Sequence, residues 1–419
     1  MKGLGVLWLI VFISLLGFGI TVIPFPLVAE NMGASPFWKT FGGAGIFSLF
    51  QLLATPLWGR LSDAWGRKPI LVASLAGTIL AYVWQAYATD LVSLLLARAL
   101  GGVMSGNLGA AFAYATDVTD TKNRAKGLGI VGSAFGIGFA VGPPIGGFLG
   151  VDAAGAPSLH VVSLVAAGLA LVALVGSVAF LPESLRPEFR RPLGAVATPA
   201  DGAPKPHGGS PFAAFRTRPV LVGLMFSSLV VGSGAAALQS VFQFWGRDQF
   251  GFGLQDVGLL FMVFAFCAAI GQAGLVGPLS RRLGEKPLAM LAIFGVIAGL
   301  LLFAVAWSPA VVWVAMAVSG IANGLFTPAI SSLVSFEADA RSRGSVMGLF
   351  NASSSAGRII GPAVAGPIYF KLGPASPFVA SAVFALLGAV LLSRAHARPV
   401  VVEESSGHAA RPGPDESEG

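Results

Sequence analysis

The chain carries the sequence Gly59-Arg60-Leu61-Ser62-Asp63-Ala64-Trp65-Gly66-Arg67-Lys68 between two long apolar runs. A similar stretch at 277–286 reads Gly-Pro-Leu-Ser-Arg-Arg-Leu-Gly-Glu-Lys and begins 218 positions later. We expect each stretch to form a charged ten-residue turn between hydrophobic segments. Their recurrence at about half the chain length predicts a membrane protein built from two copies of one unit.

The composition is that of a membrane protein. Of the 419 residues, 55% are hydrophobic and only 11% are charged, and the mean hydropathy is +0.80. Soluble domains carry roughly 25% charged residues. The single cysteine, Cys267, excludes an internal disulfide and a cysteine-based metal cluster, so we expect it to pack as a small apolar side chain.

We predict twelve helical spans, because a chain in lipid must satisfy its backbone polar groups within each segment. The predicted spans are 5–28, 41–59, 69–88, 91–116, 125–150, 159–181, 217–245, 255–280, 287–307, 309–334, 344–371 and 375–395. The first could instead be a signal peptide. Its apolar run is too long and lacks a clean cleavage site, which favours an uncleaved helix.

The basic residues are distributed unevenly across the predicted membrane. Lys39, Arg247 and Lys371 fall on one side, and Arg98 and Arg358 fall inside spans. The other 21 of the 26 Lys and Arg fall on the opposite side. The positive-inside rule makes that side the cytoplasm and places both termini there. The net charge of +7 therefore reflects topology, and we expect no nucleic-acid partner.

The chain divides into two bundles, a linker and a tail. We predict bundles at 1–182 and 217–395, joined by a cytoplasmic linker at 183–216 that is rich in Pro, Gly and Arg. The polar, acidic segment 396–419 is predicted to be a disordered cytoplasmic tail.

The duplication extends beyond the hairpins. The glycine-rich stretch 138–147 matches 357–366 at an offset of 219, and Arg124 matches Arg343 at the same offset. Two similar halves predict a pseudo-two-fold arrangement with the substrate bound between them near the midplane.

Each residue type in the first hairpin has a physical use. Gly59 and Gly66 suit a tight turn with close helix approach. Asp63 is placed to accept hydrogen bonds from the backbone N–H groups of a neighbouring helix N-terminus. Arg67 and Lys68 would hold the loop in the cytoplasm. The alternative is an ordinary solvated turn.

The pattern Gly-x-Leu-x-Asp-x-x-Gly-Arg-Lys resembles the signature of the major facilitator superfamily. The resemblance covers essentially the whole chain, since span number, duplication and linker position agree with it. The second copy keeps both glycines, the leucine and the final lysine but puts Arg281 where Asp63 stands. The implied fold is all-α, with twelve transmembrane helices in two six-helix bundles related by duplication.

The fifth predicted span has a regular spacing of small residues. It carries Gly138, Gly142, Pro143, Gly146 and Gly147. Taken alone, such a pattern most often serves helix packing. It is also similar to the antiporter motif of drug-efflux facilitators, which importers usually lack. The first span likewise resembles the opening helix of the tetracycline- and multidrug-efflux branch.

Two further charged residues match family positions. Arg98 lies within the fourth span, and the resemblance implies a role in proton coupling; the alternative is snorkelling to the outer interface. Asp117 ends that span. The resemblance implies that it joins Asp63 and Arg67 in a cluster that latches the halves on the inner side and favours the outward-open state. The alternative is a helix-end charge in water.

Several polar residues inside spans are candidates for the substrate cavity. Arg358 could contact an anionic substrate group, or could bond backbone carbonyls near Gly361 as packing. Gln239 and Gln243 share one helix face. The full candidate set is Arg358, Gln239, Gln243, Asn107, Asn323 and Asn351.

No acidic residue lies at mid-span among the 19 Asp and Glu. Efflux antiporters for cationic drugs, by family resemblance, often use such an acid for substrate and proton. Its absence, together with two arginines in spans, favours neutral or anionic ligands. Protonation would then run through peripheral acids such as Asp117, Glu30 or Asp256, or not at all.

These observations predict a secondary transporter that exports small amphipathic compounds by alternating access, through proton-coupled antiport. The alternative is a facilitator that imports a sugar or an organic anion. We expect no enzyme, cofactor or metal, since the four His lie in or near loops or tails. A sensor would usually carry a larger soluble domain. We expect a monomer in the inner (plasma) membrane.

Overall fold

The computed structural model describes residues 3–120, 124–185, 187–190, 219–337 and 343–394. The N-terminal half contains α1 Leu4–Val22, α2 Phe25–Asn31, α3 Pro36–Thr40, the π-helix η1 Phe41–Gly45, α4 Ile46–Trp65, α5 Arg67–Ala86, α6 Leu91–Met104, the 3-10 turn η2 Ser105–Asn107, α7 Leu108–Asp117, α8 Arg124–Leu149, α9 His160–Phe180 and η3 Pro187–Phe189. The C-terminal half contains α11 Pro219–Phe250, α12 Leu254–Ala269, the π-helix η4 Ile270–Leu275, α13 Val276–Leu283, α14 Glu285–Ala304, α15 Pro309–Glu337, α16 Arg343–Leu372 and α17 Ser376–Arg394.

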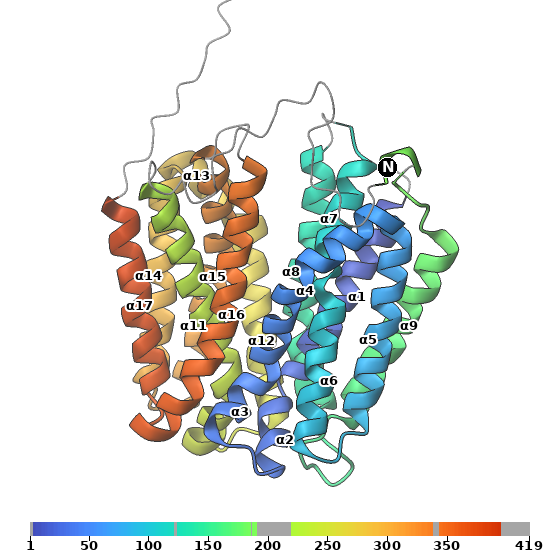
Figure 1. Cartoon of the computed structure of the whole chain (residues 1–419). Helices are drawn as coiled ribbons and strands as arrows, with labels where there is room; N and C mark the ends of the chain where they lie inside the picture. Colours follow the sequence, from blue (N-terminus) through green and yellow to red (C-terminus); the bar gives the residue numbers. More distant parts are fainter. Residues whose placement is uncertain (1–2, 121–123, 186, 191–218, 338–342, 395–419) are drawn as a thin grey trace, which may run out of the picture.

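The described elements assemble into twelve long rods in two bundles (Figure 1). Three rods are composite, because η1 joins α3 to α4, η2 joins α6 to α7, and η4 joins α12 to α13. Eleven rods are long and apolar enough to cross a membrane by length and composition. The twelfth, α16, is more polar along its length. The predicted all-α fold of two six-helix bundles is confirmed.

The two halves pack in the same order, as duplication requires. In each half the first rod packs against the fifth, the second against the fourth, and the third against the sixth. The pairs are α1 with α8 and α11 with α16, α4 with α6 and α12 with α15, and α5 with α9 and α14 with α17.

Two local predictions need correction. The first span does not run unbroken from 5 to 28: α1 ends at Val22, because Pro24 and Pro26 each lack a backbone N–H donor. The stretch at 59–68 is not a ten-residue turn. Without a helix breaker, α4 continues to Trp65 and α5 starts two residues later, so that only Gly66 makes the turn.

The bundles meet at one end and separate at the other. Figure 1 shows the start of α1, α7 and α13 at the upper end, where the bundles stand apart, and α2 and α3 at the lower end, where they converge. We call these the inner and outer ends. The predicted tail at 396–419 lies outside the described residues, as does most of the predicted linker at 183–216.

Candidate functional site

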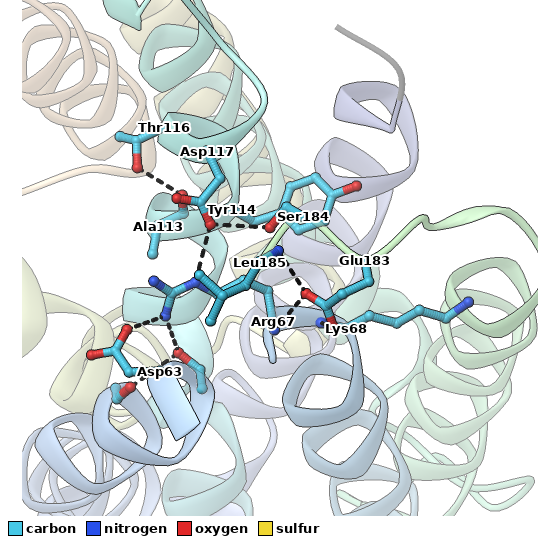
Figure 2. A network of polar contacts seen from close by, with 12 residues as sticks. Asp63, Arg67, Lys68, Ala113, Tyr114, Thr116, Asp117, Glu183, Ser184 and Leu185 are labelled. Carbon is cyan, nitrogen blue, oxygen red and sulfur yellow. Dashed lines mark hydrogen bonds and ion pairs between the residues drawn. The ribbon is translucent and has the colours of Figure 1, made fainter. Parts of the chain in front are cut away.

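At the inner end the structure brings Asp63, Arg67 and Asp117 together (Figure 2). Arg67 Nη1 lies 2.6 Å from Asp63 Oδ1, and Arg67 Nε lies 3.2 Å from Asp117 Oδ2. The guanidinium also donates to Ser62 Oγ at 2.5 Å and is largely buried. Two carboxylates thus share one cation, which links the end of α4 to the end of α7.

The backbone contact predicted for Asp63 is made by Glu183 instead. The amides of Arg67 and Lys68, at the start of α5, donate to the Glu183 carboxylate at 2.9 Å and 3.2 Å. A helix N-terminus carries unpaired N–H groups and favours negative charge. The sequence pattern does not single out Glu183, although an acid directly after Pro182 at the end of the sixth span was a usable signal.

The inner cluster lies within one half in this conformation. Its polar partners among the described residues belong to the N-terminal bundle or to Glu183 and Ser184, which follow it. The inner contact between halves, implied by resemblance for the outward-open state, stays a prediction.

The second hairpin keeps the scaffold of the first but reverses two of its charges. Lys68 Nζ donates to the Val178 carbonyl at 2.8 Å, and Lys286 Nζ donates to the Ser393 carbonyl at 3.1 Å. The turn glycines both have positive φ, 109° at Gly66 and 84° at Gly284. Arg281 stands at the position of Asp63, and Glu285 stands at the position of Arg67.

The glycine face of α8 packs against α1. A Cβ atom at Gly138, Gly142 or Gly146 would collide with the α1 backbone, at Phe12, Gly19 and Ile20 respectively. Small residues at this spacing let two helices approach closely. Pro143 also lies against α1, since its ring is close to Gly19. Most of the predicted antiporter motif therefore holds the N-terminal bundle together.

Gly147, the last residue of that motif, faces the other bundle. It lies against Gly258 on α12, so that a side chain on either residue would meet the backbone of the other. The repeat places the equivalent contact on the opposite side: Gly366 on α16 lies against Thr40 on α3. Thr40 Oγ1 also donates to the Pro362 carbonyl at 2.7 Å. These paired contacts close the outer end.

A network of charged groups crosses the same outer end. Glu30 Oε2 lies 2.6 Å from Arg247 Nη1 in the other bundle, and Glu30 Oε1 lies 2.8 Å from Lys39 Nζ. Arg247 Nε lies 3.1 Å from Asp248 Oδ1, and the Tyr369 hydroxyl donates to Asp248 Oδ2 at 2.8 Å. Burial opposes ionisation of Glu30, but the hydrogen bonds from Arg247 and Lys39 outweigh it and lower the pKa of Glu30.

The outer network also follows the repeat. Glu30 and Asp248 are separated by 218 positions, the spacing of the two hairpins. Both acids lie near the outer end of their half, Glu30 on α2 and Asp248 close to the end of α11, yet only Glu30 has a cationic partner in the other bundle among the described residues. The spacing could have identified the pair from sequence; the partner of Glu30 required the structure.

Arg98 lies inside the N-terminal bundle and does not reach the outer interface. It is 1% exposed, and its guanidinium lies 5.2 Å from the centre of the Phe25 ring. None of its guanidinium nitrogens has a hydrogen-bond partner among the described residues. The snorkelling alternative is therefore wrong for this conformation, and a coupling role stays a prediction.

The candidate cavity residues fall into two groups. Asn107 is buried and donates to Ser74 Oγ on α5, and Gln243 is buried and donates to the Gln239 carbonyl at 2.9 Å. These two are not open to solvent in this conformation. At least partly exposed are Gln239, Asn323, Asn351 and Arg358. In the described part of the chain, no group of three or more His, Cys, Asp or Glu could hold a metal ion.

Two duplicated bundles that meet at one membrane end and part at the other are typical of secondary transporters. The sequence profile of the Major Facilitator Superfamily matches residues 7–362 and, in an overlapping second match, residues 275–414. The chain belongs to this superfamily, and its relatives group it with the efflux branch.

The relatives include two drug-resistance proteins. The chain is 32% identical to the class C tetracycline resistance protein of Escherichia coli over 328 residues, which cover 77% of this chain and 78% of the relative. It is 29% identical to the class G tetracycline resistance protein of Vibrio anguillarum over 362 residues, 84% and 87% of the two chains. The crystal structure of the human organic anion transporter MFSD10 (TETRAN) is similar with a TM-score of 0.66 and 25% identity, covering 93% of this chain and 98% of that one.

Proposed function

We propose that this transporter exports small amphipathic compounds by alternating access and proton-coupled antiport. The observation that carries the proposal is the contact of Gly147 with Gly258, which closes the outer end at the last glycine of the antiporter-like motif. A conformation closed outside and parted inside is the state in which an exporter would collect its substrate. The similarity to tetracycline resistance proteins supports the same direction.

We place the protein as a monomer in the plasma membrane, the inner membrane of a bacterium, with both termini in the cytoplasm. At the inner end, the first hairpin carries Arg60, Arg67 and Lys68, and the second carries Arg281 and Arg282. This concentration of basic residues at one end supports the orientation through the positive-inside rule.

A proton path through the described carboxylates would have to use residues at helix ends. Asp117 is held in the inner cluster, and Asp256 caps α12 by accepting from the backbone amide of Gly253 at 2.9 Å. Glu30 differs from these, because opening of the outer end would remove its partner Arg247. We therefore place proton-sensitive behaviour at Glu30 first.

Everted membrane vesicles test the antiport proposal. Respiration acidifies the vesicle lumen, and a pH-sensitive acridine dye reports the gradient. Tetracycline, chosen from the relatives, should release protons from the lumen when it is added to vesicles with the wild-type chain. Asp63→Asn should reduce this release by about tenfold at equal expression, because Arg67 loses one of its two carboxylates. Absence of release for tetracycline and a panel of other amphipathic compounds, at every pH, would rule out antiport.

Import of an organic anion or a sugar is the second candidate. The description of the human relative as an organic anion transporter favours the anion among these. Uptake of labelled organic acids and sugars into intact cells, measured beside tetracycline sensitivity, separates the two directions. Accumulation of a labelled metabolite, without any change in drug sensitivity, would favour import.

A further inference from the structure

Arg358 lies on the face of α16 that is turned away from lipid. The outer face of this helix carries the exposed apolar residues Ile360 and Val364. Successive helical residues are rotated by about 100°, so Arg358 lies about 160° around the helix from Ile360. On the same side as Arg358, nearer the outer end, lie Ala365 and Tyr369, which are both buried in the core. Arg358 therefore points toward the protein interior.

The neighbours of α16 place this face between the two bundles. Gly357 and Gly361 pack against α11 of the same bundle, while Gly366 packs against α3 of the other. The side of α16 between these two contacts, opposite the lipid side, contains Arg358. The nearest of these outer contacts, Thr40 with the Pro362 carbonyl, lies about 6 Å farther along the helix. Arg358 thus sits one turn inside the outer closure.

The guanidinium of Arg358 is poorly satisfied by the protein. Its Nη2 donates to Ser355 Oγ at 2.8 Å, and no described carboxylate forms an ion pair with it. Guanidinium carries several more N–H donors in a planar fork suited to an oxyanion. The side chain is half-buried, in contrast to Arg98, which is sealed at 1% exposure. Of the two arginines within spans, Arg358 is the one that keeps some exposed surface in this conformation.

The neighbouring polar groups are also suited to an acid. Ser355 and Asn351 precede Arg358 by about one and two turns and lie on the same side of α16, toward the inner end. Hydroxyl and amide groups can donate to an oxyanion. The described part of the chain offers no acid at this depth, so the local charge is one unneutralised cation.

We propose that Arg358 binds the acidic group of the transported compound, which makes the substrate an amphipathic monoanion such as a carboxylate or a sulfonate. This inference rests on the proposed transport function and names its substrate class. The single cation selects one negative charge, and the guanidinium fork with the hydroxyl of Ser355 holds the oxyanion.

Binding of a matched pair of probes to the purified full-length chain tests the proposal. We choose naphthalene-2-sulfonate and the uncharged naphthalene-2-sulfonamide, and measure each by isothermal titration calorimetry. The wild-type chain should bind the sulfonate about 10- to 100-fold more tightly than the sulfonamide, as expected for a hydrogen bond to a charged group. Arg358→Gln should lose this preference, and Arg358→Lys should keep part of it. Arg281→Gln, an exposed arginine at the inner end, is the matched control and should retain it.

Each contrary outcome is informative. Equal affinity of the wild-type chain for both probes overturns the proposal without any variant, so a folding defect in Arg358→Gln cannot protect it. No saturable sulfonate binding by a wild-type preparation with a cooperative thermal transition also overturns it. The same is true if Arg358→Gln keeps the wild-type preference. Tetracycline-driven proton release in vesicles is an independent readout, so its persistence would leave the export proposal standing when this one fails.

Discussion

Gly66 has two separate reasons to be glycine. Its φ of 109° with ψ of 160° lies in a backbone region that residues with a Cβ rarely adopt, and a Cβ there would also collide with the Glu183 carboxylate. That carboxylate accepts hydrogen bonds from the first backbone amides of α5. One residue therefore sets both the direction of the chain and the access of the helix N-terminus to its acid.

Substitution of Gly66 by alanine should destabilise the protein. We expect a cost of about 1–3 kcal/mol from backbone strain, seen as a lower melting temperature of the purified chain. Gly59→Ala is the matched control, because Gly59 lies inside α4 with nothing near its Cβ position. That variant should be stabilised by roughly 0.5–1 kcal/mol. Equal melting temperatures for the two variants would contradict this account of the hairpin.

At the scale of elements, the glycines of α8 contact two different helices, α1 in the same bundle and α12 in the other. Gly138, Gly142 and Gly146 hold it against α1 within the bundle, while Gly147 meets Gly258 of the other bundle. The first contact is permanent in a rigid bundle, whereas the second exists only while the outer end is closed. The repeat provides the matching helix, α16, with the same division of contacts.

Gly147→Leu should prevent the outer end from closing. A leucine would meet the backbone of α12, so the bundles would stay apart there and export would fail. We would introduce a cysteine at Thr40, which is buried in the outer contact, after Cys267→Ser removes the native thiol. Its accessibility to a membrane-impermeant maleimide should rise about fivefold or more with Gly147→Leu, at unchanged expression. Gly132→Leu on the same helix has open space at its Cβ position and should behave like the wild type. Wild-type export by Gly147→Leu would exclude the contact as a closure.

The elements were more predictable than their contacts. Long apolar runs predict spans because lipid leaves the backbone no other partner, and repeated landmarks predict the two bundles. The last turns of α4, up to Trp65, are polar. Hydrophobicity alone therefore assigns them to a loop, although they are helical. The role of Glu183 depends on a fold that returns the end of the sixth rod to the start of the third. The acid after Pro182 marks the residue, but local sequence does not show which helix N-terminus it meets.

At the scale of the whole molecule, the outer end is closed by packing and by charge. The glycine contacts fix how closely the bundles approach, and the Glu30–Arg247 pair joins the two bundles across that closure. Lys39 belongs to the N-terminal bundle and lies 4.8 Å from the centre of the Phe370 ring in the other one. All of these contacts must break when the outer end opens, so weakening them should favour the outward-open state.

Glu30→Gln should shift the conformational equilibrium toward outward-open. Spin labels at Ser35 and Gln255, both exposed near the outer end, report the separation of the bundles after Cys267→Ser removes the native thiol. Exposed ion pairs contribute roughly 0.2–1 kcal/mol, so the ratio of long to short distances should rise by a factor of about 1.4 to 5. Arg247→Gln should have the same effect, and the double variant should add little, because both remove one bond.

Asp90→Asn separates this effect from a general loss of outer charge. Asp90 caps α6 by accepting from the backbone amide of Ser93 at 2.9 Å, a contact within its own bundle. Its substitution by asparagine keeps a good helix cap and should leave the distance distribution unchanged. A Glu30→Gln distribution that superimposes on those of the wild type and Asp90→Asn would show that the ion pair does not hold the outer end closed.

The same pair makes the outer closure sensitive to acid. Lys39 from α3 and Arg247 from α11 face Glu30, with Asp248 and Tyr369 beyond Arg247. Because the closed state lowers the pKa of Glu30, ionised Glu30 favours closure above its usual pKa of about 4.3, and this contribution is lost as pH falls through the lowered value. Long spin-label distances should therefore increase in the wild type as the pH is lowered from 7 to below 4. Glu30→Gln should start with more long distances and change less, whereas equal pH responses would show that Glu30 is not the source of the acid sensitivity.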